Sequence, residues 1–237
     1  MIKKVIVSDV MDRFIKSIDF TQTVLSHSNA GADTTIFVSD VYHSFKKGTC
    51  KIDGSDYVIK SVNYVKNSVV VIGVIVTPLI YDVGTPIFIH GISTMVTKRV
   101  NKLASEKKTP FIYLLGNDNG YNVNNVRKTY NHFENIDIFF VADNGRTPNG
   151  TDEADYHIDD ISQPLRNLKT KFCNELNKYK MFGVEYMNKQ FNHRYRVFFG
   201  DVYKGTGKNT DKSVFDARLD ALQLSFELPI DTDYCSN

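Results

Sequence analysis

The sequence predicts an α+β fold, in which a small antiparallel β unit with a leading helix precedes a mixed or antiparallel sheet with helices packed on one face. Three patterns predict it. Apolar residues at helical spacing open the chain, and short β-branched runs separated by turn residues follow. In the second half, helical and strand patterns come in the order helix, two strands, helix, two strands. We predict two domains, residues 1–84 and residues 85–237.

The first predicted element is a helix near the start of the chain. Ser8 is a suitable N-cap, because its hydroxyl can accept a hydrogen bond from a free N–H of the first turn. The apolar residues after it recur three and four residues apart, which puts them on one helix face: Val10, Met11, Phe14, Ile15 and Ile18. We expect this face to pack on the helix's own domain. The alternative is an arm that docks on a neighbouring subunit.

Strand patterns then predict a small barrel or sandwich over residues 34–78. Turn residues at 28–33 end the first unit, which precedes it. The clearest hairpin, 51–59, has Asp53-Gly54 as its turn, a pair suited to positive φ. The run Val69–Val76 is rich enough in β-branched residues that we expect burial on both of its faces. A domain boundary follows at Pro78, Gly84 and Pro86.

The second domain contains the most regular patterns of the chain. A helical pattern over 91–105 precedes a compact apolar strand at 111–115, and a second strand is predicted at 136–142. The clearest helix is 162–180, with Pro164 in its first turn, where a missing N–H costs nothing. The last strands are predicted at 194–199 and 219–228. In the final one, apolar and polar residues alternate, so we expect one buried and one largely polar face.

Composition excludes several classes of protein. The 237 residues carry a net charge of +2, too little for a protein that wraps a duplex. The three cysteines, Cys50, Cys173 and Cys235, are too few and too far apart for a disulfide framework, so we expect reduced thiols. The longest apolar run, Val69–Val76, is too short to cross a bilayer, and no signal peptide is recognisable. We therefore expect an intracellular product without a membrane partner.

No motif in the sequence indicates catalysis. The segment 205–208, Gly-Thr-Gly-Lys, lacks the spacing and the following Ser or Thr of a phosphate-binding loop, so a hairpin tip is the better interpretation. His157 lies among carboxylates, which leaves a divalent-ion site there as one alternative. We predict no catalytic residue, no cofactor and no metal ligand, and hence not an enzyme.

The order of elements in the second domain resembles the neck proteins of tailed bacteriophages, above all the tail-completion or tail-terminator group and related head–tail connector rings. The resemblance lies in the strands 110–115 and 136–141, the helix 162–180, and a loop at 200–207 that leads into the strand ending at Pro229. Residues 1–78 resemble an appended connector or stopper-like module.

The resemblance implies a structural virion protein, made in the host bacterial cytoplasm, that forms a homo-oligomeric ring in the neck. Its partners would be copies of itself, the adjacent portal or connector and tail proteins, and DNA that passes through the lumen without specific binding. Contacts between subunits or rings are expected in the two long polar loops, at Arg146, Asp201, Tyr203, Lys204 and Lys208. The alternatives are another virion component, such as a tail-tube cap or baseplate subunit, and an enzyme with a metal site near His157.

Overall fold

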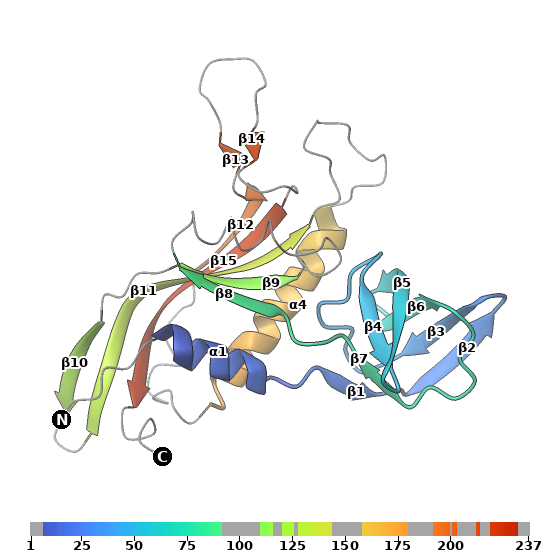
Figure 1. Cartoon of the computed structure of the whole chain (residues 1–237), viewed down its shortest axis with the longest axis horizontal. Helices are drawn as coiled ribbons and strands as arrows, with labels where there is room; N and C mark the ends of the chain where they lie inside the picture. The colour runs from blue at the N-terminus through green and yellow to red at the C-terminus, as the bar shows by residue number, and fades with distance from the viewer. Residues whose placement is uncertain are drawn as a thin grey trace. The chain divides into compact units, whose positions relative to one another are not determined.

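The chain forms an α+β fold that is rich in sheet, as Figure 1 shows. The computed structural model describes the backbone of residues 7–91, 110–115, 120–125, 128–143, 158–179, 192–199, 201–202, 212–213 and 219–231, and the side chains of 7–91, 110–115, 136–143, 161–179 and 219–228. Two compact units are distinguished. The small β unit comprises Asp19–Thr85, with which residues 158–168 also group, and the larger unit comprises α1, the strands from β8 onward and the remainder of α4.

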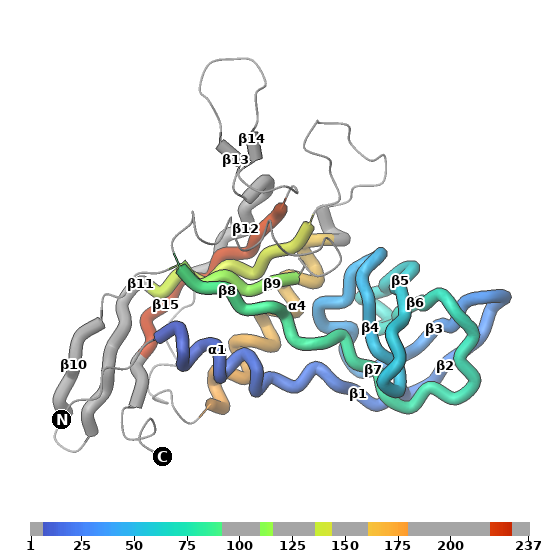
Figure 2. Tube along the Cα trace, in the orientation of Figure 1, coloured from blue at the N-terminus to red at the C-terminus, as the bar shows by residue number. Residues whose placement is uncertain are grey.

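The small β unit is a curled seven-stranded antiparallel sheet with the order β1-β7-β4-β5-β6-β3-β2. Figure 2 traces its path, in blue to green. The strands are β1 (Thr21–Thr23), β2 (Ser26–Ala30), β3 (Asp33–Phe37), β4 (Thr49–Ile52), β5 (Ser55–Asn63), β6 (Ser68–Ile72) and β7 (Ile80–Asp82). The two strands at the ends of this order, β1 and β2, are separated in the chain by Val24 and Leu25 alone. The Val24 N–H donates to Leu79 O and the Leu25 N–H to Phe37 O, so this segment bridges both ends of the sheet and curls it into a barrel-like unit.

Small apolar side chains fill the inside of this unit. Ile36, Val41, Val69 and Val71 are fully buried there, as is the larger side chain of Tyr81. The predicted Asp53-Gly54 turn is confirmed: both residues have positive φ, 49° and 84°, and they join β4 to β5. The turn predicted at 28–33 is present, with Gly31 at the tip of the β2–β3 hairpin, but it does not end the first unit, because the hairpin belongs to the sheet that continues after it.

The larger unit is built on a mixed six-stranded sheet with the order β12-β15-β11-β9-β8, in which β10 pairs with β11 as well. Its strands are β8 (Ile87–Gly91), β9 (Phe111–Leu115), β10 (Gly120–Asn125), β11 (Lys128–Asp143), β12 (Asn192–Phe199) and β15 (Leu219–Asp231). Only the β8–β9 pair is parallel among these described pairings. A separate short hairpin pairs β13 (Asp201–Val202) with β14 (Lys212–Ser213).

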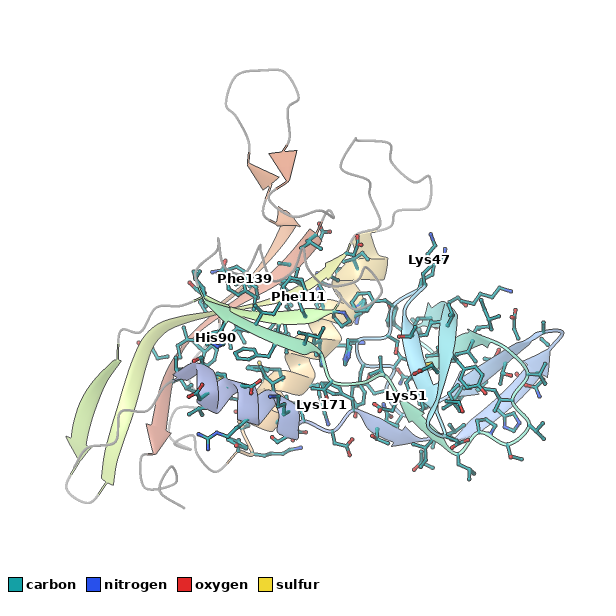
Figure 3. All side chains as sticks on the ribbon, in the orientation of Figure 1. Lys47, Lys51, His90, Phe111, Phe139 and Lys171 are labelled. Carbon is teal, nitrogen blue, oxygen red and sulfur yellow. The ribbon has the colours of Figure 1, made fainter. Side chains whose placement is uncertain are left out.

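Both faces of this sheet are buried at its centre. On one face an apolar cluster includes Phe111 and Phe139, which Figure 3 labels, together with Ile89, Tyr113, Val141, Leu219 and Ala221. Tyr113 stacks on Phe139 with ring centroids 5.5 Å apart. We predicted one buried and one largely polar face for the final strand, but this division does not extend over its whole length. Leu219, Asp220 and Ala221 in succession are fully buried.

The two described helices meet the other face through a cluster of aromatic rings. The helices are α1 (Val7–Ser17) and α4 (Ile158–Leu176). Phe172 of α4 packs edge-to-face on Phe14 of α1, 5.2 Å between centroids, and on Phe140 of β11, 5.3 Å. The apolar face of α1 thus packs within the chain, but on α4 and the larger unit rather than on the predicted first domain, residues 1–84.

Two details of the helices differ from the predictions, and one predicted helix is not described. α1 already includes Val7, so Ser8 lies inside the first turn rather than at the N-cap. α4 begins at Ile158, which places Pro164 in the helix interior, where it cannot donate the usual backbone hydrogen bond. The predicted helix over 91–105 falls almost entirely outside the described residues.

Candidate protein-interaction surface

The outer face of β6 and of the segment after it is apolar and open to solvent. Residues alternate along this stretch: Val69, Val71 and Ile75 point into the core, and the residues between them point outward. The outward residues Ile72, Val74 and Val76 are 54%, 57% and 77% exposed. The prediction that Val69–Val76 is buried on both faces is therefore wrong, because in this chain nothing described covers its outer face.

Hydrogen bonds to the β2–β3 hairpin fix the backbone of this segment. The Gly73 N–H donates to Ala32 O at 2.8 Å, the Thr34 hydroxyl donates to Gly73 O at 2.7 Å, and the Ile75 N–H donates to Thr34 Oγ1 at 2.9 Å. Gly73 has φ of 126°, and a Cβ there would lie 3.3 Å from the Tyr57 ring. These hydrogen bonds fix the backbone of residues 73–75, so the alternation of inward and outward side chains continues beyond β6.

The apolar surface continues past Pro78 to Leu79 and Ile80. The Asp53 carboxylate positions both residues, because it accepts the Leu79 N–H at 3.1 Å and the Ile80 N–H at 2.9 Å. Leu25 follows Val24, whose N–H is bonded to Leu79 O, so it lies at the same end of the unit. We call the six exposed side chains the apolar stripe: Leu25, Ile72, Val74, Val76, Leu79 and Ile80.

Single exposed apolar residues are common on protein surfaces, but a contiguous set on one face marks a contact with another molecule. Outward positions of a solvated antiparallel strand usually carry polar residues. Here three successive outward positions, Ile72, Val74 and Val76, are β-branched and more than half exposed. A surface of this kind can bind protein through buried apolar area, and it offers no group for acid–base or nucleophilic chemistry.

A second feature of the small β unit is a polar cluster formed by His43, Ser44, Tyr64 and Tyr81. The Ser44 and Tyr81 hydroxyls are hydrogen-bonded to each other, and the Tyr64 hydroxyl donates to Ser44 O at 3.0 Å. His43 is 1% exposed; its Nε2 lies 3.0 Å from Gly84 O, whereas its Nδ1 has no partner among the described residues. Burial lowers the pKa of His43 to about 3, so the ring is neutral at neutral pH and Nε2 is the donor.

His43 also connects the two ends of the small β unit. Phe20, at its start, packs edge-to-face on the His43 ring with centroids 4.6 Å apart, and Gly84, at its end, supplies the carbonyl that the ring bonds. We interpret the cluster as structural, with one unsatisfied nitrogen as its weak point.

The predicted contact residues are not brought together by the described structure. Asp201 lies in β13 with its backbone opposite Ser213, which confirms a hairpin at the base of the predicted loop. Tyr203, Lys204, Lys208 and Arg146 lie outside the described residues, as do His157 and segment 205–208. The apolar stripe was missed because a β-branched run gives the same sequence signal whether one face or both are buried.

Within the part of the chain whose side chains are described, no group of His, Cys, Asp and Glu is arranged to hold a metal ion. Cys50 and Cys173 are free thiols, and burial raises their pKa to about 12 and about 11. Among the described helices, none combines the length and the hydropathy needed to span a bilayer. Neither protein-family models, nor curated proteins, nor solved structures give a match to this chain.

Proposed function

We propose that this chain is a structural virion protein that assembles with copies of itself into a ring at the head–tail interface of a tailed phage. In this role it would join the portal or connector to the tail around a lumen through which DNA passes. The larger unit, with helices on one face of a mixed sheet, would be the tail-terminator-like part, and the small β unit an appended connector module. The observation that carries the proposal is the apolar stripe, since a surface of this kind is expected on a protein whose work is assembly.

The size of the stripe sets the strength of the contact. Its six side chains are each roughly half to three quarters exposed, so their complete burial would contribute on the order of 5–10 kcal/mol at about 1.5–3 kcal/mol per side chain. Association itself costs about 4–15 kcal/mol. One such contact therefore gives only a weak dimer. In a closed ring every copy makes two contacts, so the ring is held together more strongly than the dimer. We expect assembly to be cooperative and concentration-dependent.

A net charge of +2 also supports a channel protein. Each phosphate that a lysine or arginine neutralises adds to the affinity for DNA, and a lumen that must release its DNA cannot hold it at many points. The predicted contacts at Arg146, Asp201, Tyr203, Lys204 and Lys208 belong to this proposal. Deletion of residues 201–212 tests the four contacts in the second loop, because it should leave the monomer folded and abolish assembly; unchanged assembly would refute their role.

The proposal is tested by measuring mass in solution over a range of concentrations, by light scattering and native mass spectrometry. A ring predicts one large species of fixed subunit number. Val74→Lys should abolish it, because a buried lysine ammonium would lose its hydration. The matched control is Thr170→Lys, which adds the same side chain at an exposed position of α4. A protein that remains monomeric at every concentration, also with virion neighbours added, would refute self-assembly.

The place in the particle needs a second measurement. Electron microscopy of virions labelled with an antibody against this chain should put the label at the head–tail junction. A label at the far end of the tail would instead favour a baseplate component, and a label on tails that lack heads would favour a tube cap.

A further inference from the structure

The chain enters and leaves the small β unit side by side. The entering strand β1 pairs antiparallel with the leaving strand β7. Phe20 lies just before β1, and Gly84 lies just after β7. The His43 ring comes from the segment 39–48, between β3 and β4; it packs on the Phe20 ring and donates through Nε2 to Gly84 O. We call these three residues the base clasp, because one ring contacts both the entering and the leaving chain.

The backbone on both sides of the His43 ring is held in unusual conformations. Tyr42 has φ of 44°, and its N–H donates to the Asp40 carboxylate at 2.7 Å. Gly84 has φ of 78°, and its N–H donates to the Asp82 carboxylate at 2.7 Å. A residue other than glycine at positive φ is strained and persists where its surroundings hold it in place. The base clasp is therefore a constrained arrangement, and the contacts of the ring help to maintain it.

The segment that carries the ring is attached to the rest of the unit by other side chains as well. The Gln22 side-chain oxygen accepts one of its backbone N–H groups at 3.0 Å. The Ser44 and Tyr81 hydroxyls are bonded to each other, and the Tyr64 hydroxyl donates to the Ser44 carbonyl. Burial raises the pKa of Tyr81 above its ordinary value. Amides and hydroxyls keep their charge between pH 5 and pH 8, which is the interval in which histidine titrates. Of these anchors, His43 alone therefore responds to pH there.

The carboxylates next to the clasp residues in the sequence do not compensate a charge on the ring. Each of them accepts a backbone N–H of its own segment: Asp19 from Thr21, Asp40 from Tyr42 and Asp82 from Gly84. Burial and the hydrogen bond to Gly84 O are the two causes that set the pKa of His43, and burial is the larger. The Nδ1 atom has no hydrogen-bond partner among the described residues. A proton taken from solvent onto Nδ1 would thus create a buried cation with one unsatisfied donor, which is unfavourable until the ring reaches water.

We infer that His43 opens the base of the small β unit in acid: the protonated ring turns out to water, and its contacts with Phe20 and Gly84 are lost. The residues released in this way lengthen the two connections between the small β unit and the larger unit. The strands β3, β5 and β6 stay paired, because their contacts do not involve the ring. This inference concerns a local opening and does not depend on the proposed assembly.

The size of the effect follows from the two protonation equilibria. In the open base the ring has its ordinary pKa of 6.5, and in the closed base burial lowers the pKa to about 3. The closed form is therefore fully favoured above pH 6.5 and becomes less favoured as the pH falls toward 3. Between pH 7 and pH 5 the ratio of open to closed base should rise about 25-fold.

Native-state hydrogen exchange of the full chain at pH 7 and pH 5 tests the opening. Mass spectrometry reads the amides, and the rates are corrected for the pH dependence of the chemical step. The protection of amides in 20–24 and 80–85 should fall about 25-fold at pH 5. Their exchange should depend little on urea, because the open base exposes little new surface. The amides of β6 should depend steeply on urea, because they exchange only when the whole unit unfolds.

Two variants assign the opening to the ring. His43→Gln keeps a donor for Gly84 O and does not titrate, so the 25-fold gain should vanish. His27→Gln, on the exposed strand β2, is the matched control and should retain the gain. An equal gain in His43→Gln would overturn the inference.

The wild-type measurement decides by itself if His43→Gln does not fold. Base amides with the same urea dependence as those of β6 at pH 5 would show that the ring titrates only when the whole unit unfolds, and the inference would then be wrong. None of these results bears on ring assembly, which light scattering measures separately.

Discussion

Acid should destabilise the small β unit through a single buried ring. His43 has an ordinary pKa of 6.5 when the chain is unfolded, and burial lowers the pKa to about 3 in the folded state. Between these two pH values, His43 therefore binds a proton in the unfolded chain but not in the folded chain. The folded state has its full stability above pH 6.5 and loses stability as the pH falls from 6.5 toward 3.

The loss can be worked out at a chosen pH. At pH 5 the unfolded ring is almost fully protonated and the folded ring is not, so the free energy of unfolding falls by about 2 kcal/mol, at about 1.4 kcal/mol per pH unit below the unfolded pKa. Ordinary carboxylates remain largely ionised at this pH, which is why the interval from pH 7 to pH 5 isolates histidines.

Urea unfolding at the two pH values measures this loss, with hydrogen exchange and mass spectrometry assigning the transition of residues 19–85. His43→Gln keeps an N–H donor for Gly84 O but does not titrate, so the difference between pH 7 and pH 5 should shrink by about 2 kcal/mol. His27→Gln, on the exposed strand β2, is the control and should leave the difference unchanged. An equal pH dependence in wild type and His43→Gln would show that the ring is not kept neutral by burial.

Three further changes have expected outcomes. Phe172→Ala should lower the free energy of unfolding by about 3–5 kcal/mol, measured by urea unfolding, because it removes the ring on which α1 and β11 both pack. Asp53→Ala should cost about 1–3 kcal/mol in the same assay, since it removes the acceptor of two N–H groups and places alanine at positive φ, whereas Asp53→Asn should cost less than half of that. With the third cysteine replaced by serine, Cys50 and Cys173 should react with Ellman's reagent at pH 8 at least about 100-fold more slowly in the folded protein than in urea, because burial raises both thiol pKa values.

The strongly periodic elements could be predicted from the sequence. Helix α4 has an apolar period that only a helix satisfies, and strand β9 and the centre of β11 are apolar runs too short for a helix. The Asp53-Gly54 turn has a backbone preference of its own. These elements were found at about their observed positions.

The missed strands have no such pattern. All five residues of β2, Ser26–Ala30, are exposed, so no hydrophobic alternation exists to reveal them. The strand exists because its backbone pairs with β3, an interaction between residues that sequence patterns do not encode. The three-residue strands β1 and β7 are too short for a period to emerge.

The candidate site was missed for a related reason. The sequence shows that Val69–Val76 is apolar at nearly every position, and it cannot show what covers each face. In β9 the residues Phe111–Leu114 are buried on both faces within the chain. In β6 and its continuation, the inner face packs in the same way, and the outer face meets solvent.

The apolar run of β6 differs from that of β9 in having one face without a packing partner among the described residues. Removal of apolar area from water is favourable by the same amount per unit area wherever it occurs. Burial of the outer face of β6 against another molecule would therefore be favourable, because this face is exposed in the folded monomer. One partner protein could bury this face, whereas a ring of identical copies also needs a second surface that differs from the stripe. In either case Val74→Lys should abolish the contact, because the lysine ammonium would be buried there, whereas Thr170→Lys, at an exposed position of α4, should leave it intact.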